Sequence, residues 1–323
     1  MSKKITALVI GMAAVFSPLA SAQSPAYPNQ SIKIIIPYQA GGGTDQILRV
    51  ITPRVSEILK TQIVVVNQPG ANTVLGMRAA MDAKPDGYTL VLSTNTSFSL
   101  IPYTMQPQPY DPKKAFSIIT AVGETPMILT THPGFAKDIN EFTKKVESSP
   151  GKYSYATYGV GGITHLAAEV LLGEMDLKMN QIPYKGVEAV TNLAGGQVDS
   201  MVDGINSPSA LIAAGKIIPL AILQHTRSKF LPNTPTLTEI GYPKASTSTI
   251  SYILAAPKAT PPQVIDTLYK AFSTALADKN VIQKIEQTKS QVLQMTPQES
   301  EAYLDNEANR FQKIIKERGL KFN

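Results

Sequence analysis

Three absences limit what this 323-residue chain can do before any motif is considered. It contains no cysteine, which excludes disulfide bonds, thiolate metal ligands and a cysteine nucleophile, and leaves a periplasmic and a cytoplasmic location both open. Its formal charge of +6 is spread along the chain without a dense basic block, so we expect no nucleic-acid partner. Beyond the N-terminus, no apolar run reaches the roughly 18 residues of a membrane span.

The signatures of common enzymes are also missing. There is no Gly-x-x-x-x-Gly-Lys-Ser/Thr phosphate loop, no Gly-x-Gly-x-x-Gly fingerprint and no Gly-x-Ser-x-Gly nucleophile elbow. The three histidines, His132, His165 and His225, are isolated in the sequence. Asp199 and Asp203 form a pair that can do acid–base work, although aspartates that flank a turn are commoner. We therefore predict no metal, no cofactor and no catalytic residue.

The N-terminus carries the features of a secretory signal peptide. Lys3 and Lys4 form a positive segment, an apolar segment follows over 5–16, and Ala20-Ser21-Ala22 provides an A-x-A cleavage site. We expect residues 1–22 to be removed, which would change the formal charge from +6 to +6 − 2 = +4. The mature protein is therefore expected to be exported to the periplasm.

A glycine-rich turn at 37–45, Pro-Tyr-Gln-Ala-Gly-Gly-Gly-Thr-Asp, is the most informative stretch of the chain. It lies between a β-branched run at 30–37 and a segment, reaching about Lys60, with apolar residues at helical spacing. Glycine lets the backbone approach a ligand, and a helix N-terminus presents unpaired N–H groups and a positive dipole end. The turn is either an anion-binding corner or a tight turn capped by Thr44 or Asp45, and spacing alone does not decide between these.

Strands and helices are predicted to alternate along the first half. Expected strands are 30–37, 62–67 and 88–93, with helices up to 60 and at 74–83; a loop, short helix and strand follow over 111–124, and another strand at 127–131. The β-α-β-α-β series predicts a parallel sheet with helices on both faces, where ligands bind at the carboxyl ends of the strands. The turns at 40–45, 69–73 and 93–97 should therefore gather at one edge.

The second half is organised around a second glycine-rich turn, Tyr158–Thr164. Expected strands are 153–157, 179–184, 200–202, 220–223 and 251–256, and expected helices are 139–146, 165–175, 187–194, 208–215, 262–278, 280–288 and 297–318. No long linker separates the two α/β halves, which suggests two lobes joined by crossing strands with a cleft between them. The tyrosines beside glycine turns, Tyr38, Tyr158 and Tyr184, either line this cleft or are ordinary half-buried residues.

A series of short motifs covers essentially the whole mature chain. They are Tyr27-Pro28, Ile34–Tyr38, Gly41–Asp45, Asn67–Ala71, Lys84–Leu90, Gly159–Gly161, His165–Ala167, Pro183–Gly186, Gly195–Asp199, Pro232–Pro243 and Ala256–Pro261. In this order they resemble the substrate-binding proteins of tripartite tricarboxylate transporters, the Bug or TctC family. The resemblance implies an α/β fold of the type II periplasmic binding protein kind, with two Rossmann-like lobes joined by crossing strands and a ligand cleft between them. Lobe one would be 27–126 plus 252–323, and lobe two 127–251.

The resemblance also implies a function and a site. The expected protein is a monomeric, non-enzymatic receptor that captures a small organic acid and delivers it to the membrane subunits of a tripartite tricarboxylate-type transporter. In relatives, the turns matching Ala40–Asp45 and Thr157–Thr164 grip a carboxylate through backbone N–H and hydroxyl groups, and water often meets the other end of the ligand. The predicted ligand-binding residues are Tyr38, Ala40, Gly41, Gly42, Thr44, Asp45, Asn72, Thr94, Thr157, Tyr158, Gly159, Gly161, Gly162, Thr164, His165, Tyr184 and Asp203.

The chain departs from the family pattern at three places that reshape the pocket. Gly162 stands where many relatives have Ser or Thr, Ser251-Tyr252-Ile253 stands where a Trp-Tyr/Phe-Gly run is common, and Tyr38 replaces a phenylalanine. A dicarboxylate, an acidic amino acid, a nicotinate-like ring and an aromatic dicarboxylate all remain candidates, and the tyrosines favour an aromatic acid. Two other functions stay open: a sensor subunit for a membrane signalling partner, and an exported enzyme using Asp45, His165 or Asp203.

Overall fold

Three parallel strands begin the chain, in agreement with the sequence pattern. In the computed structural model, which describes residues 27–246 and 249–322, strand β1 (Ile32–Ile36) lies between β2 (Ile63–Asn67) and β3 (Thr89–Thr94). β1 reads Ile-Lys-Ile-Ile-Ile, and its four isoleucines are buried, as expected for a strand covered by helices on both sides of the sheet. The predicted signal peptide at 1–22 lies outside the described residues.

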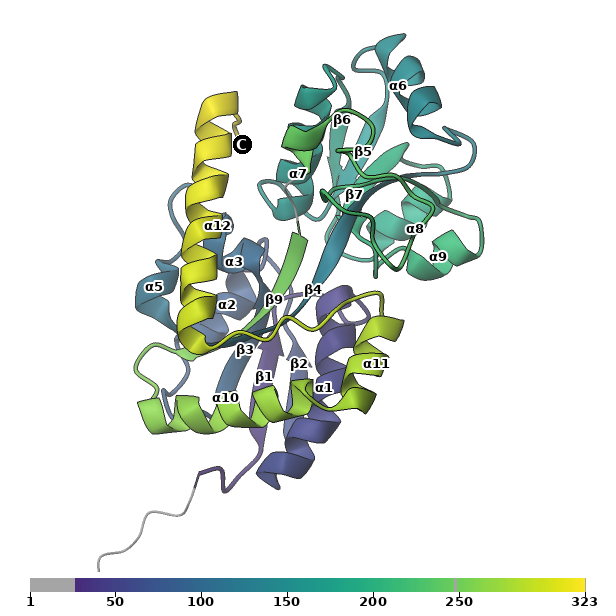
Figure 1. Cartoon of the computed structure of the whole chain (residues 1–323). Coiled ribbons are helices and arrows are strands. Elements are labelled where there is room, and N and C mark those ends of the chain that lie inside the picture. The colour runs from purple at the N-terminus through teal and green to yellow at the C-terminus, as the bar shows by residue number, and fades with distance from the viewer. Residues whose placement is uncertain (1–26, 247–248, 323) are drawn as a thin grey trace, which may run out of the picture.

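The sheet is mixed, although the β-α-β-α-β series alone predicted a parallel one. Strand β9 (Thr249–Pro257) pairs antiparallel with β3, and β4 (Phe116–Thr131) pairs antiparallel with β9. β9 enters this sheet from the second half of the molecule and therefore runs against β3. Figure 1 shows β4 and β9 passing between the two halves.

Strand β4 corrects the prediction of one strand that ends at 124 and a separate strand at 127–131, whereas the short helix predicted within 111–124 is present as α5 (Pro112–Ala115). It is one strand of 16 residues, whose first part pairs with β9 and whose last residues, from Met127, pair with β7 (Ser200–Gly204) and β8 (Ile218–Ile222). Gly123 and Pro126 are residue types that often interrupt a strand, so the sequence predicted a break between two strands here. The strand continues through them because shifts in pairing register near Ala121 absorb the irregularity.

The second half has its own α/β layer. β5 (Ser154–Thr157) pairs parallel with β6 (Asn180–Pro183) and β7. Its helices are α6 (Ile139–Glu147), α7 (Ile163–Glu174), α8 (Glu188–Ala194) and α9 (Ser209–Ala213), and a short 3₁₀ helix covers Pro243–Ala245. All strands join one continuous pairing path, with β8 added on β4.

The remaining helices cover the first half and reach the second. They are α1 (Gly43–Leu59), α2 (Val74–Met81), α3 (Asn95–Ser99), α4 (Ile101–Thr104), α5 (Pro112–Ala115), α10 (Pro262–Leu276), α11 (Lys279–Gln287) and α12 (Pro297–Arg318). α12 runs along both halves (Figure 1): Leu304 packs in a core of the first half, and Phe311 is buried in the core of the second. Arg318 at its end pairs with Glu174 of α7.

The stretch 93–97, predicted as a turn, contains the start of helix α3 instead. The asparagine, threonine and serines of this segment have low helix propensity, so the sequence did not predict the helix. Tertiary hydrogen bonds hold it in place: the Ser99 hydroxyl donates to Leu304 O at 2.8 Å, and Asn95 Nδ2 donates to Thr249 O at 3.1 Å. Across the described ranges, no helix is both long and apolar enough to cross a membrane.

Candidate ligand-binding site

A pocket lies between the two halves, at the carboxyl ends of the strands. It is a cavity of about 110 Å³. The residues that line it are Tyr38, Gln39, Gly42, Gly43, Thr44, Asn72, Thr73, Thr94, Thr96, Tyr158, Gly162, Ile163, Thr164, Lys185, Gly186, Val187, Asp203, Asn206, Ser207, Ile250 and Tyr252. The turns after β1, β2, β3, β5, β6 and β7 all contribute, so the three early turns do gather at one edge.

Asp45 stabilises the first glycine-rich turn through hydrogen bonds. Gly41 adopts φ of +83°, Gly42 is the extended residue that begins α1, and Gly41 N–H donates to Asp45 Oδ2 at 3.0 Å. Arg49 Nε donates to the same oxygen at 2.9 Å, and Asn67 Nδ2 donates to Oδ1 at 3.1 Å. Burial alone would raise the pKa of Asp45, but these hydrogen bonds outweigh burial and lower it. Asp45 is therefore ionised and faces its own turn.

The second glycine-rich turn has the same backbone design. Gly161 adopts φ of +76°, Gly162 is the extended residue that begins α7, and Gly161 N–H donates to His165 Nδ1 at 3.1 Å. Burial lowers the pKa of His165, and the nearby Glu169 offsets this only in part, so the ring is neutral and accepts through Nδ1. His165 orients the loop and lies outside the pocket lining, although it was among the predicted ligand-binding residues.

Both turns end in a helix whose N-terminus faces the pocket. The backbone N–H groups of the first turns of α1 and α7 have no acceptor within their helices. Thr44 and Thr164 occupy the same position, two residues after the N-cap glycines, and both line the pocket. Neither Thr44 nor Asp45 caps α1, which was the other interpretation of the first turn. Two helix N-termini and two threonines thus form a corner suited to a carboxylate.

The turn before α2 has strained backbone. Ala71, Asn72 and Thr73 all have positive φ, at 45°, 51° and 76°, which is unfavourable for residues with a Cβ and especially for the β-branched Thr73. The Asn72 side chain reaches the other half, where its Nδ2 donates to Val160 O at 2.7 Å. Thr104 makes a second such contact by donating to Gly161 O at 3.0 Å. The first half therefore braces the second glycine-rich turn.

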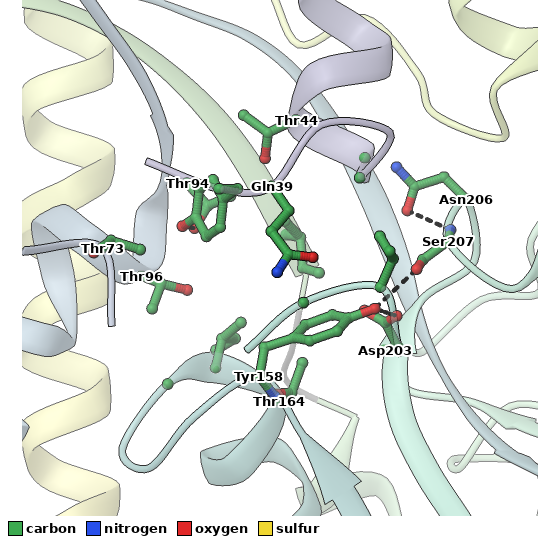
Figure 2. Close-up of a pocket in the computed structure, with 18 of the residues that line it drawn as sticks. Gln39, Thr44, Thr73, Thr94, Thr96, Tyr158, Thr164, Asp203, Asn206 and Ser207 are labelled. Carbon is green, nitrogen blue, oxygen red and sulfur yellow. Dashed lines mark hydrogen bonds between the residues drawn. The ribbon is translucent and has the colours of Figure 1, made fainter. Parts of the chain in front are cut away.

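On the side opposite Thr96, Asp203 is buried against Tyr158 (Figure 2). The Tyr158 hydroxyl donates to Asp203 Oδ2 at 2.7 Å, Gly204 N–H donates to Oδ1 at 2.7 Å, and the Ser207 hydroxyl lies 2.9 Å from the Tyr158 oxygen. Burial raises the pKa of Asp203 to about 6, although its hydrogen bonds partly oppose this. The carboxyl group fixes the Tyr158 ring along one wall of the pocket.

Two further tyrosines line the pocket, and their hydroxyls are hydrogen-bonded to protein groups. The Tyr38 hydroxyl lies 2.8 Å from Thr94 Oγ1. The Tyr252 hydroxyl accepts from Asn206 Nδ2 at 2.8 Å, and burial raises its pKa to about 12. Because these hydroxyls are occupied, the rings supply mainly apolar surface.

Nine of the seventeen predicted ligand-binding residues line the pocket. They are Tyr38, Gly42, Thr44, Asn72, Thr94, Tyr158, Gly162, Thr164 and Asp203. The other eight, Ala40, Gly41, Asp45, Thr157, Gly159, Gly161, His165 and Tyr184, do not line it. Several of these shape the turns instead: the Thr157 hydroxyl donates to Gly159 O at 2.9 Å, and Gly159 and Gly161 adopt positive φ.

Twelve lining residues were not predicted. They are Gln39, Gly43, Thr73, Thr96, Ile163, Lys185, Gly186, Val187, Asn206, Ser207, Ile250 and Tyr252. The local signals for Gln39, Gly43 and Ile163 were available, because these residues lie inside the two glycine-rich turns. Asn206 and Ile250 had none, since they reach the pocket only when β7 and β9 take their places, and Tyr252 was indicated only by the family pattern around Ser251-Tyr252-Ile253. Within the described ranges, no three His, Asp or Glu side chains could share a metal ion.

Comparisons with known proteins agree on one family. The sequence model described as "Tripartite tricarboxylate transporter family receptor" matches residues 47–320. Protein BugT of Bordetella pertussis is 29% identical over 320 residues, which are 98% of this chain and 97% of BugT.

Two solved structures share the whole architecture. The periplasmic binding protein BugD is 30% identical, with a TM-score of 0.85 over 91% of this chain and 99% of that one. MatC from Rhodopseudomonas palustris, solved with bound malate, is 26% identical, with a TM-score of 0.84 over 90% of this chain and 100% of that one. The fold is therefore the two-lobed α/β fold of periplasmic binding proteins.

Proposed function

Because the chain belongs to the tripartite tricarboxylate transporter receptor family, we propose that it captures a small organic carboxylate in the periplasm and delivers it to the membrane subunits of such a transporter. The family consists of substrate-binding proteins, and MatC in this fold holds malate. One observation in this chain carries the proposal: the N-termini of α1 and α7, one from each half, face the same pocket with Thr44 and Thr164 beside them.

The proposal includes export through a signal peptide and closure of two lobes. We place lobe one at 27–126 plus 252–323 and lobe two at 127–251, with a hinge where β4 and β9 cross. Residues of both lobes line the pocket, so bringing the lobes together would enclose a ligand and separating them would release it. The end of α12, which packs on lobe two, would have to follow this movement.

We propose binding without turnover. Asp203 already accepts hydrogen bonds from Tyr158 and Gly204, His165 lies beneath its loop, and Asp45 is engaged by Arg49 and Asn67. All three groups are thus engaged in hydrogen bonds that hold the fold, which supports capture of an acid rather than its conversion.

A thermal-shift screen of the mature protein tests the proposal. A panel of small carboxylates should be paired with the carboxamide of each, which has the same shape without the charge. Ligands that bind only the folded state raise the melting temperature, and a ligand at 100 times its Kd adds about 2.7 kcal/mol to stability. We expect shifts with some carboxylates and none with their amides. Shifts with amides alone would refute carboxylate capture.

A further inference from the structure

Most hydroxyl groups that line the pocket already have partners. Tyr38 pairs with Thr94, Tyr158 with Asp203 and Ser207, and Tyr252 with Asn206. Thr73 Oγ1 accepts from the Ser97 hydroxyl at 2.9 Å, and Thr164 Oγ1 accepts from Tyr158 N–H at 3.0 Å. Among the described residues, two lining hydroxyls have no partner, those of Thr44 and Thr96.

These two hydroxyls differ in their surroundings. Thr44 belongs to the first turn of α1, where the proposed carboxylate would lie. Thr96 is on a different side of the pocket, with its oxygen directed toward the interior in Figure 2, and only 5% of the residue is exposed. Its Oγ1 is shielded from solvent and unpaired. In this arrangement Oγ1 is also closed to water-sized atoms inside the pocket. A buried hydroxyl without a partner is unfavourable, so a ligand group that enters as the proposed lobes move is the partner that would satisfy it.

The charges of the pocket indicate which group Thr96 meets. The lining contains one cation, Lys185, and one carboxyl group, Asp203, which lies across the pocket from Thr96. The nearest lining neighbours of Thr96 along the chain and in Figure 2, Thr94 and Thr73, are neutral. The two helix N-termini together balance about one negative charge. A second carboxylate beside Thr96 would be buried without a cation, which is costly.

We propose that Thr96 determines specificity by hydrogen-bonding an uncharged polar group, such as a hydroxyl, at the end of the ligand remote from its carboxylate. This inference rests on the proposed function and deepens it, because it names the ligand class as a monocarboxylate with a distal hydroxyl. The tyrosine rings of Tyr38, Tyr158 and Tyr252 would contact the apolar middle of such a molecule.

Two matched ligand series test this by calorimetric titration of the mature protein. The first is butyrate, 4-hydroxybutyrate and succinate, and the second is hexanoate, 6-hydroxyhexanoate and adipate. Within a series only the distal group changes, from methyl to hydroxyl to carboxylate. In at least one series the wild type should bind the hydroxy acid about tenfold or more tightly than the methyl and carboxylate members.

Variants assign this preference to Thr96. Thr96→Val should remove the preference for the hydroxy acid over the methyl acid, and Thr96→Ser should retain it. Thr260→Val is the matched control, because Thr260 is also 5% exposed with an unpaired Oγ1 but lies outside the pocket lining. It should leave all affinities unchanged.

The outcomes separate the two proposals. An unchanged preference in Thr96→Val, or tighter binding of the dicarboxylates by the wild type, would overturn the role of Thr96 while leaving carboxylate capture in place. If no carboxylate of the panel binds, capture itself fails and the inference fails with it. The role of Thr96 is supported if Thr96→Val loses the preference for the hydroxy acid while Thr96→Ser and Thr260→Val keep it.

Discussion

The two glycine-rich turns, Gly41–Asp45 and Gly161–His165, share a local design and differ in what supports them. In both, a glycine with positive φ precedes an extended N-cap glycine, and the third residue of the helix accepts a hydrogen bond from the first glycine. The first turn uses an ionised carboxylate that Arg49 and Asn67 hold within the same half. The second uses a neutral imidazole.

The second turn, unlike the first, is also supported from outside its own half. Asn72 and Thr104 bond to the carbonyls of Val160 and Gly161, and Phe322, beyond α12, packs edge-on against His165 with ring centroids 5.0 Å apart. The side-chain hydrogen bonds of the first turn therefore come from its own half, whereas part of the support of the second turn depends on how closely the two halves approach. This difference gives each turn its own sensitivity to mutation and to pH.

The largest effect is expected at the first helical position, where the turns differ most. Gly43 in the first turn corresponds to Ile163 in the second, and a Cβ at Gly43 would lie 2.2 Å from Asn206 Nδ2. Asn206 is buried and bonded at both ends of its amide, so it cannot move aside cheaply. Gly43→Ala should weaken carboxylate binding by about 100-fold or more, because the halves could not close fully.

Stability separates this effect from misfolding. Alanine is a better helix former than glycine, but its Cβ would also lie 2.8 Å from the Tyr252 hydroxyl, so Gly43→Ala should lower the melting temperature without abolishing cooperative unfolding when no ligand is present. Calorimetric titration and thermal unfolding measure the two quantities. Binding at wild-type affinity would show that the pocket does not require this close approach.

The next effect compares the two glycines with positive φ. An alanine costs about 1–2 kcal/mol in this backbone region at either site. At Gly41 its Cβ meets nothing within 4 Å, but at Gly161 it lies 2.9 Å from Thr104 Oγ1 and 3.3 Å from Phe322. Gly161→Ala should therefore lower the free energy of unfolding by more than Gly41→Ala, by about 2–3 kcal/mol in all. Equal losses in chemical denaturation would contradict external support of the second turn.

Removing the charge of Asp45 tests the internal support of the first turn. Asp45→Asn loses the ion pair with Arg49 and weakens three hydrogen bonds to a buried carboxylate, so stability should fall by about 1.5–2 kcal/mol. Glu57→Gln, which breaks an exposed pair with Arg54, is the control and should cost less than about 1 kcal/mol. If both variants unfold at the same denaturant concentration, Asp45 does not support its turn as described.

The bond from Thr104 to Gly161 should have a smaller effect. Thr104→Val keeps the shape of the side chain and removes the donor, at a cost of about 0.5–1.5 kcal/mol. Because the bond joins the two halves, ligand affinity should fall by up to about tenfold, with a faster release rate in stopped-flow measurements. A release rate equal to that of the wild type would show that the bond does not hold the halves together.

The smallest effect concerns pH. The pKa of buried His165 is lowered, so as pH falls through about 6.5 the unfolded chain takes up a proton that the folded chain resists, and stability falls. The pKa of Asp45 is also lowered, so its contribution is present above pH 4 and is lost only in stronger acid. The pKa of Asp203 is raised to about 6, so its effect has the opposite sign: the contribution of Asp203 to the stability of the protein declines as pH rises toward 6.

A single substitution isolates the histidine. Asn at position 165 keeps an acceptor for Gly161 N–H but cannot be protonated, and Asp203 and His132 stay the same in both proteins. Between pH 7.5 and 5.5, the melting temperature of His165→Asn should fall by less than that of the wild type. Parallel pH profiles would show that His165 does not make the second turn sensitive to acid.

The sequence predicted most elements because their signals are local. Ile32–Ile36 is a buried strand whatever lies around it, and the apolar spacing of α1, α10 and α12 shows at once which face is buried. The sequence also indicated where both helices that reach the pocket begin. In each turn the glycine with positive φ and the N-cap glycine are adjacent, and such a Gly-Gly pair predicts a turn before a helix. The prediction failed at β4 and α3, where long-range pairing and distant hydrogen bonds override weak or misleading local preferences.

The tertiary structure alone decided which side chains line the pocket. Asp45 and His165 lie in the right turns, yet both point beneath them, because each accepts the N–H of the glycine four residues earlier. Asn206 and Tyr252 complete the pocket from β7 and β9, far from either turn in sequence. The chain by itself therefore predicted an exported receptor with two anion-binding corners. The shape of the pocket and the unpaired hydroxyl of Thr96 arise only when the two halves of the molecule meet, because no local spacing encodes a contact between them.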